Sequence, residues 1–278
     1  MLFVPATEPR KVSKALDSKA DCVILDLEDA VAVSEKKNAR LAVRDILAGK
    51  GDRQVYVRIN SIDTPFLYGD LTTIIAGSPT GVMLPKAETA EQVRCVDWLI
   101  SQLEMESGLA LGQIGLITLI ETAGGVGRAP EIACSSSRIK CMAFGAIDYT
   151  LDIGTKLSEY GHELFYGRSQ VVVASRMGGC AKPIDTVYSD FRNADGLRRD
   201  SELALCLGYQ GKMIIHPDQI DIVNETFSPS QEELAYARKV VAAFEEAEKN
   251  GVASVNLEGK MIDYPVVNRA RQLLEMNK

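Results

Sequence analysis

Two acidic residues, Glu121 and Asp148, follow short apolar runs that are rich in β-branched residues. Glu121 comes directly after residues 114–120, and Asp148 lies just beyond residues 139–145. If both runs are neighbouring parallel strands, their carboxyl ends meet at one edge and bring the two carboxylates together. Two carboxylates, completed by water and a chelating substrate, suit Mg²⁺, which keeps part of its hydration shell. The pair therefore predicts a Mg²⁺ site, although each carboxylate could instead cap the helix after it.

Arg58 lies near the end of another apolar run, residues 55–59, and its guanidinium stays protonated at neutral pH. It could bind a substrate carboxylate or an oxygen on which negative charge develops. It could also form a buried ion pair with Asp26 or Glu28, which share one face of an expected strand because they are two residues apart. We expect Asp26, Glu28 and Asp29 to orient either Arg58 or metal-bound water.

Lys86 and His216 also stand at expected strand ends, and each has more than one possible role. A desolvated lysine could form a Schiff base, whereas the carboxylate pair offers a metal route. His216 could pack at the rim of the fold or take part in catalysis. The only other histidine is His162, which argues against a His-rich metal site or a Ser-His-Asp triad. The chemistry is therefore expected to depend on carboxylates and arginine.

The overall composition narrows the class of protein. The 278 residues are 46% hydrophobic and 25% charged, which suits an ordinary globular protein. A net charge of −7 without a basic, aromatic patch argues against a nucleic acid partner. No apolar run approaches the roughly 20 residues needed to cross a bilayer, and the six cysteines form no CxxC pair. We therefore expect a cytoplasmic protein without a membrane partner.

Strand-like and helix-like segments alternate along most of the chain. Helical spacing occurs, for example, at residues 35–47, 90–103 and 164–177. Eight apolar runs are expected to be strands: residues 2–5, 22–27, 55–59, 81–84, 114–120, 139–144, 183–187 and 212–215. Eight such units predict an α/β protein with a (β/α)8 TIM barrel over residues 1–227. A doubly wound sheet is the alternative, but Pro130 interrupts the only glycine-rich segment that resembles a dinucleotide site.

Residues 228–278 follow a different pattern. Ser230 and Glu233 have the spacing of a capping box, which predicts the start of a long amphipathic helix. A small hairpin is expected within residues 253–262, followed by a helix with Pro265 in its first turn. This helix-hairpin-helix extension could cover the barrel or reach a neighbouring subunit.

At these positions the chain resembles the citrate lyase beta-subunit-like group of acyl-CoA lyases, which includes citramalyl-CoA and malyl-CoA lyases of the HpcH/HpaI aldolase-like superfamily. The resemblance covers nearly the whole length. The matching segments are residues 2–5, 25–30, 57–60, 84–86, 120–122, 184–190, 211–212, 215–217 and 259–263. Each segment is short, but together they are specific.

The resemblance implies a Mg²⁺-dependent barrel, commonly a trimer, that cleaves or forms a carbon-carbon bond next to a thioester. Glu121 and Asp148 match its metal carboxylates, and Glu121 is also expected to contact substrate. Arg58 matches an arginine that binds substrate and stabilises the thioester enolate. Asp263 matches a catalytic aspartate that a neighbouring subunit contributes, although its position alone suggests only a helix N-cap.

The resemblance leaves several reactions open. It favours cleavage of (3S)-citramalyl-CoA to acetyl-CoA and pyruvate, with malyl-CoA as a close alternative. A citrate lyase beta subunit that acts on an acyl-carrier-protein thioester is a rival, and a barrel that binds ligand without turnover is a third reading. Ile147 departs from the family, which usually has glutamate before the second metal carboxylate. The residues that bind CoA stay unassigned, with Arg10 and Lys11 as candidates.

Overall fold

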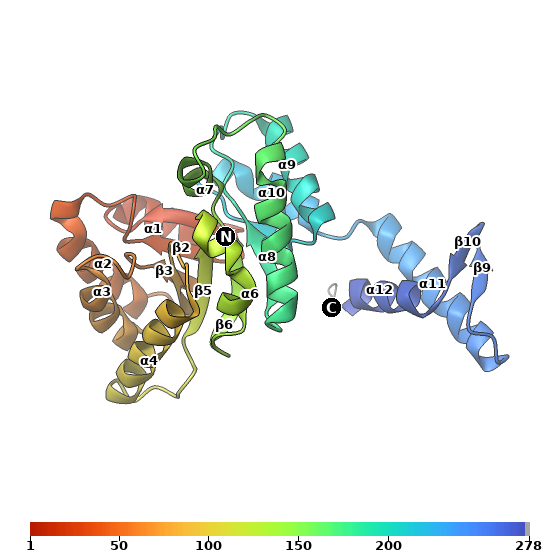
Figure 1. Cartoon of the computed structure of the whole chain (residues 1–278), viewed down its shortest axis with the longest axis horizontal. Coiled ribbons are helices and arrows are strands. Elements are labelled where there is room, and N and C mark those ends of the chain that lie inside the picture. The colour runs from red at the N-terminus through yellow and green to blue at the C-terminus, as the bar shows by residue number, and fades with distance from the viewer. Residues whose placement is uncertain (276–278) are drawn as a thin grey trace. The chain divides into compact units, whose positions relative to one another are not determined.

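The computed structural model describes residues 1–275, which form two compact units, one ending at Phe227 and one beginning at Ser228. In the first unit, eight strands form one parallel sheet in the order of the chain (Figure 1). The strands are β1 (Leu2–Pro5), β2 (Val23–Asp26), β3 (Val55–Arg58), β4 (Gly81–Leu84), β5 (Gly115–Ile120), β6 (Ile139–Phe144), β7 (Ala181–Asp185) and β8 (Gly211–Lys212).

Two backbone hydrogen bonds join the last strand of this sheet to the first. Ile214, just after β8, donates its N–H to the Met1 carbonyl oxygen at 2.9 Å. The Phe3 N–H donates in turn to the Ile214 carbonyl oxygen at 2.9 Å. Because a sheet whose first and last strands are neighbours is closed, the predicted (β/α)8 barrel is confirmed.

Five strands differ in their bounds from those expected, namely β2, β3, β5, β7 and β8, and the differences are largest in β7 and β8. β7 begins at Ala181, two residues before the expected start at Pro183. The sequence prediction missed Ala181 and Lys182 because they are exposed and do not belong to an apolar run. β8 ends at Lys212, and beyond it only Ile214 pairs with β1. Apolar runs thus locate the buried part of a strand, whereas the hydrogen-bond ladder decides where the strand ends.

Helices cover the outside of the strands in the first unit (Figure 1). In α4, Thr89 Oγ1 accepts a hydrogen bond from the Gln92 N–H at 3.2 Å, and Val93, Val96 and Ile100 form a buried stripe at helical spacing. The helices are α1 (Pro9–Leu16), α2 (Lys36–Ala48), α3 (Leu67–Ile74), α4 (Ala90–Glu106), α5 (Ala123–Gly127), α6 (Ala129–Ala133), α7 (Ala146–Asp152), α8 (Phe165–Met177), α9 (Ala194–Leu207) and α10 (Ile220–Phe227).

The strands bury apolar side chains on both faces, as parallel strands usually do. One face packs against the helices in a large core that includes Leu25, Val57 and Leu84. The other face fills the inside of the barrel with the side chains of Ile24, Met83, Ile117, Leu119, Cys141, Ala143, Ile184 and Met213. Most of the polar residues that could do chemistry therefore stand at the strand ends.

The second unit is a helix-hairpin-helix. It contains α11 (Gln231–Lys249), β9 (Val255–Leu257), β10 (Lys260–Ile262) and α12 (Tyr264–Glu275). The predicted capping box forms, because Ser230 Oγ accepts from the Glu233 N–H at 3.1 Å while the Ser230 N–H donates to Glu233 Oε2 at 2.8 Å. Phe244, Ile262 and Val267 are buried in its own small core.

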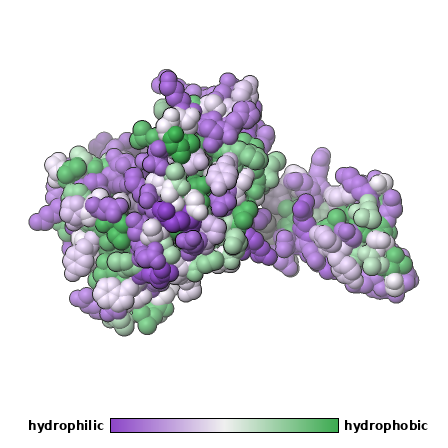
Figure 2. All heavy atoms as spheres, viewed as in Figure 1, coloured by the Kyte–Doolittle hydropathy of each residue, from purple (hydrophilic) through white to green (hydrophobic). Residues whose placement is uncertain are grey.

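The surface is mixed in character. On the face that Figure 2 shows, hydrophilic side chains surround smaller hydrophobic patches. Exposed apolar side chains recur along one stretch of the first unit: Ile147, Leu151, Ile153, Leu157, Tyr160, Phe165 and Tyr166. Among residues 1–275, every helix is too short or too polar to cross a membrane.

Candidate active site

A cavity of about 860 Å³ opens at the carboxyl ends of the barrel strands, the edge where barrel enzymes carry out their chemistry. Phe3, Ile147 and Met213 give it an apolar lining, and Lys11 of α1 contributes a basic side chain. The lining also includes most of the residues that the sequence singled out, namely Asp26, Asp29, Arg58, Glu121, Asp148 and His216.

Arg58, at the end of β3, is held by three carboxyl groups. Its Nε donates to Asp26 Oδ1 at 2.8 Å and its Nη2 donates to Asp26 Oδ2 at 2.6 Å. Its Nη1 lies 3.0 Å from Glu28 Oε2 and 3.3 Å from Asp29 Oδ2. Burial alone would lower the pKa of Arg58, but the hydrogen bonds and charges of these acids outweigh it and raise that pKa. Arg58 therefore contacts both Asp26 and Glu28, the two residues that the sequence offered as its ion-pair partners.

Arg58 nevertheless keeps one side open to the cavity. Its guanidinium carbon lies 4.9 Å from the centre of the Phe3 ring, and the side chain lines the cavity. A guanidinium has five N–H groups, two of them on Nη2. Among the described residues, only Asp26 accepts a hydrogen bond from Nη2 of Arg58. The second N–H of this nitrogen is therefore left for a ligand.

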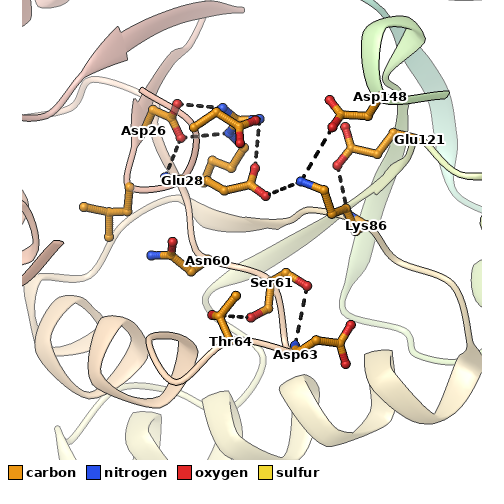
Figure 3. Close-up of polar contacts among 12 residues, drawn as sticks. Asp26, Glu28, Asn60, Ser61, Asp63, Thr64, Lys86, Glu121 and Asp148 are labelled. Carbon is orange, nitrogen blue, oxygen red and sulfur yellow. Dashed lines mark hydrogen bonds and ion pairs between the residues drawn. The ribbon is translucent and has the colours of Figure 1, made fainter. Parts of the chain in front are cut away.

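Lys86 connects the two sides of the site (Figure 3). Its Nζ donates to Glu28 Oε1 at 2.6 Å and lies 3.7 Å from Asp148 Oδ1. Its backbone has a φ of +49°, a left-handed conformation that is uncommon for lysine, and its N–H donates to Glu121 Oε1 at 2.9 Å. Burial would lower the pKa of Lys86, but its contacts with Glu28 and the charge of Glu121 raise it. A lysine held as a cation in this way is poorly suited to form a Schiff base.

Glu121 is almost fully buried at the end of β5, with 2% of its surface exposed. Burial, followed by the negative charges of Asp148 and Glu28, raises the pKa of Glu121 to about 8. The carboxyl group lies against Gly145, where an added Cβ would stand 2.5 Å from Glu121 Oε2. Glycine at this position therefore keeps space open beside an oxygen that the hydrogen bond from Lys86 does not use.

Asp148 lies in the first turn of α7, just beyond β6, and its side chain is 31% exposed. Figure 3 shows its carboxyl group next to that of Glu121, above Lys86. The two strand ends thus bring together the two carboxylates that the sequence paired. Within residues 1–275, no group of three or more acidic, His or Cys side chains is arranged as a metal site, so a cation here would need water or substrate as further ligands.

The charges around this cavity do not balance. We call five residues the carboxylate cluster: Asp26, Glu28, Asp29, Glu121 and Asp148. The cations that contact the cluster are Arg58, Lys86 and Lys36, whose Nζ donates to the Leu27 and Glu28 carbonyl oxygens at 2.7 and 2.6 Å. Five acidic groups thus face three cations, and burial raises the pKa of Glu28 as well as that of Glu121. This surplus of oxygen donors fits a hard divalent cation such as Mg²⁺.

His216 lies at the rim of the cavity. It stacks on Phe191 with ring centres 4.7 Å apart, and its Nδ1 accepts a hydrogen bond from the Asp218 N–H at 3.3 Å. The His216 side chain therefore caps the short 3-10 helix Pro217–Gln219 that follows β8, and it also lines the cavity. These contacts account for the histidine structurally, and Phe191 is a neighbour that sequence reasoning missed.

Asp263 lies in the second unit, directly before α12. Its Oδ1 accepts a hydrogen bond from the Val266 N–H at 3.3 Å, so the residue has the N-cap contact that its position suggests. The catalytic role that the resemblance implies for Asp263 stays a prediction.

Comparison with known proteins places this geometry in a family. Residues 1–217 match the model of the HpcH/HpaI aldolase/citrate lyase family, and residues 167–277 match that of carbon-carbon bond lyases of the TIM-barrel fold. The citrate lyase subunit beta of Leuconostoc mesenteroides subsp. cremoris is 37% identical over 99% of this chain and 92% of its own. The mitochondrial citramalyl-CoA lyase of Rattus norvegicus is 32% identical over 99% of this chain and 85% of its own.

A solved structure agrees with these sequence matches. The protein CitE from Mycobacterium tuberculosis, in complex with magnesium, acetoacetate and coenzyme A, is 34% identical to this chain, with a TM-score of 0.80. The match covers 99% of this chain and 96% of that one. The resemblance seen in the short motifs therefore extends over the whole fold, and the chain belongs to the HpcH/HpaI aldolase/citrate lyase family.

Proposed function

We propose that the protein is a Mg²⁺-dependent carbon-carbon lyase that cleaves (3S)-citramalyl-CoA into acetyl-CoA and pyruvate. Membership of the family makes the chain a carbon-carbon lyase that acts on a thioester. The observation that carries the proposal is the surplus of carboxyl groups beside an arginine fork, in a cavity of about 860 Å³. A cavity of this size is within the range of small-molecule sites.

Glu121 and Asp148 would hold the cation. When bound, Mg²⁺ would supply Lewis acidity toward the substrate hydroxyl and its neighbouring carboxylate. Lys86 holds Glu121 through its backbone N–H and approaches Asp148 with its ammonium group, so both carboxylates are oriented before a ligand arrives. Orientation in advance lowers the cost of assembling the site.

Arg58 would stabilise the charge that develops during cleavage. The hydroxyl loses its proton, the carbon-carbon bond breaks, and the electron pair passes to the thioester oxygen as an enolate. Asp26 holds the arginine by two hydrogen bonds, so its remaining Nη2 N–H has a fixed direction. A donor that is preorganised for negative charge stabilises the transition state more than a mobile one. Protonation of the enolate then yields acetyl-CoA.

We propose that Asp263 of a neighbouring copy takes the hydroxyl proton in a homo-oligomer, with a trimer favoured by the family resemblance. An aspartate that begins a helix is held by its backbone contacts while its second oxygen stays available. In this proposal, Asp263→Asn removes most activity but leaves folding and Mg²⁺ affinity intact.

Mixing subunits tests this arrangement. Asp263→Asn and Arg58→Ala subunits, each inactive alone, should regain part of the activity when they are mixed and allowed to exchange. Mixed oligomers without any activity, despite proven exchange, would rule out a site shared between copies.

The reaction itself is tested with a panel of substrates. Purified protein is incubated with citramalyl-CoA, malyl-CoA and citrate, with Mg²⁺ or with chelator, and acetyl-CoA, pyruvate, glyoxylate and oxaloacetate are quantified. We expect Mg²⁺-dependent pyruvate and acetyl-CoA from citramalyl-CoA. Release of glyoxylate alone would favour a malyl-CoA lyase, and the absence of metal-dependent product from either CoA ester would rule out the preferred reaction.

A second candidate is the beta subunit of citrate lyase, which would act on a citryl thioester of an acyl-carrier protein. Sequence identity favours it, with 37% to the Leuconostoc mesenteroides subunit against 32% to the rat citramalyl-CoA lyase. Coenzyme A in the CitE complex instead supports a CoA thioester. Cleavage of citryl-acyl-carrier protein to oxaloacetate, without cleavage of either CoA ester, would select the second candidate.

A further inference from the structure

Asp148 depends on a short helix that cannot cap its own start. α7 has seven residues, Asp148 lies in its first turn, and the N-cap position is Gly145. The first N–H groups of any helix lack partners within the helix and need acceptors from elsewhere. A serine, threonine, asparagine or aspartate at the N-cap usually supplies one, but glycine has no side chain to do so.

The carboxylate pair itself explains why position 145 is glycine. A Cβ at this position would lie 2.5 Å from Glu121 Oε2 and 2.8 Å from Glu121 Cβ. Any capping side chain would therefore displace Glu121. The helix that carries Asp148 therefore lacks a capping side chain at Gly145, where such a side chain would collide with Glu121.

Thr186 supplies the missing cap from another strand. It follows β7, lines the cavity and is 3% exposed, and its Oγ1 accepts a hydrogen bond from the Ala146 N–H at 2.8 Å. Ala146 is the first residue of α7, two positions before Asp148. The preceding residue, Asp185, is buried and accepts hydrogen bonds from both Arg168 and Lys212, so the position of Thr186 does not depend on either cation alone.

The other end of α7 is tied to the neighbourhood of Glu121. Asp152, the last residue of α7, accepts a hydrogen bond at its Oδ2 from the Ala123 N–H at 2.7 Å. Ala123 begins α5 and lies two residues after Glu121. Contacts with two neighbouring strand ends therefore hold the short helix, one at each of its own ends.

We propose that Thr186 is a positioning residue for the cation site, because it holds α7 at the place where Asp148 can share a ligand with Glu121. The inference rests on the proposed function in one respect, the binding of Mg²⁺ by these two carboxylates. Thr186 itself does not need to touch the cation. Groups that orient metal ligands in this way commonly change affinity by about 10–100-fold when they are removed.

The test compares Mg²⁺ affinity by calorimetry for the unmodified protein and its variants. Thr186→Val keeps the shape but removes the acceptor, and we expect a loss of affinity of about tenfold or more. Thr186→Ser keeps the hydroxyl and should retain most of the affinity. Thr186→Ala serves as a second variant without the hydroxyl if Thr186→Val does not fold.

Thr150→Val is the matched control within α7. Thr150 is buried, and its Oγ1 donates to the Ala146 carbonyl oxygen at 2.9 Å, so this change removes a hydrogen bond of the helix without touching its cap. A threonine that bonds back to a carbonyl contributes little to a helix, so we expect an affinity within about twofold of the unmodified protein.

The outcomes separate the two proposals. Unchanged affinity in both Thr186→Val and Thr186→Ala, or an equal loss in Thr150→Val, would overturn the positioning role while leaving Mg²⁺ binding established. An unmodified, folded protein that binds no Mg²⁺ would instead refute the metal site of the proposed function. Lost affinity in Thr186→Val, with recovery in Thr186→Ser, supports the inference.

Discussion

Two arginines in this barrel make the same contact with an aspartate but stand in different electrostatic surroundings. Arg58 binds Asp26 through Nε and Nη2 at 2.8 and 2.6 Å, and Arg168 binds Asp185 through the same atoms at 2.9 Å each. Arg168 is completely buried, whereas Arg58 lines the cavity. The difference lies in what surrounds each pair.

Around Arg168 the charges balance. Lys212 Nζ lies 2.5 Å from both Asp185 and Asp200, and Arg168 also bonds to Asp200 at 2.8 Å. We call these four residues, with two cations and two carboxylates, the buried network. The carboxylate cluster has five acidic groups against three cations and opens into a cavity. A balanced and mostly buried network stabilises the fold, whereas an unbalanced one that opens into a cavity is available to a ligand.

The largest expected effect is on stability in the buried network. Arg168→Met leaves Asp185 without its paired guanidinium in a site that water does not reach, and removal of one partner from a buried pair costs about 3–5 kcal/mol. Urea unfolding measures this loss. A decrease below about 1 kcal/mol would mean that the network does not stabilise the fold as its geometry suggests.

The same conservative change in both clusters should separate function from stability. Arg58→Lys keeps the charge but loses the planar fork, and we expect kcat/KM to fall by about 10²–10³, as for the loss of one preorganised donor. Arg168→Lys, the matched control, should lower the unfolding free energy and leave kcat/KM of the folded enzyme unchanged. Equal losses of kcat/KM in the two variants would contradict the distinction.

The two regions should also respond to pH in opposite directions. Burial raises the pKa of Glu28, so its contribution to stability is present below its unfolded pKa and is lost as pH rises through the folded value. Burial acts in the same direction on Asp200, but Lys212 and Arg168 outweigh it and lower that pKa. The contribution of Asp200 is therefore present above its unfolded pKa and is lost as pH falls through the folded one.

Unfolding free energies measured between pH 3 and pH 7 (roughly the range in which carboxyl groups titrate) check this contrast. Glu28→Gln should reduce the loss of unfolding free energy as pH rises toward 7. Asp200→Asn should reduce the loss of unfolding free energy as pH falls toward 3. If Glu28→Gln changed the unfolding free energy only at acid pH, the pKa of Glu28 would be lowered in the folded protein. Arg58 and Lys86 would then outweigh the effect of burial, contrary to this expectation.

The smallest expected effect concerns Ile147, which stands beside Asp148 where the family resemblance leads us to expect glutamate. Ile147 lines the cavity and is 51% exposed. Ile147→Glu adds a half-exposed negative charge, which should tighten Mg²⁺ binding by about 0.2–1 kcal/mol. Leu151→Glu, one turn further along α7 and 79% exposed, is the control and should change affinity less. Calorimetry in low salt resolves the difference.

Much of the barrel could be predicted because apolar runs and helical spacing are local properties of the chain. The pairing of Glu121 with Asp148 followed from the rule that parallel strands end at one edge. Side-chain alternation on a strand predicted Asp26 and Glu28 as partners of Arg58, whereas the contact of Asp29 with Arg58 does not follow from alternation.

The remaining contacts could not be predicted, because they depend on backbone geometry and on distances between strands. Nothing local indicates that Lys86 adopts a left-handed conformation or that its N–H reaches Glu121. Thr186 caps a helix 40 residues away in the chain. The one available signal was Gly145 at the start of α7, since a glycine where a capping side chain is usual suggests that the acceptor comes from elsewhere.

Magnesium binding by the carboxylate pair tests the central claim most directly. Calorimetric titration of the metal-free protein near pH 7 should show one Mg²⁺ per chain, and Glu121→Gln and Asp148→Asn should each abolish most of this binding while the fold is retained. Arg168→Lys, in the balanced network, should bind Mg²⁺ like the unmodified protein. Full binding by both carboxylate variants, or no binding by the unmodified protein, would contradict the account.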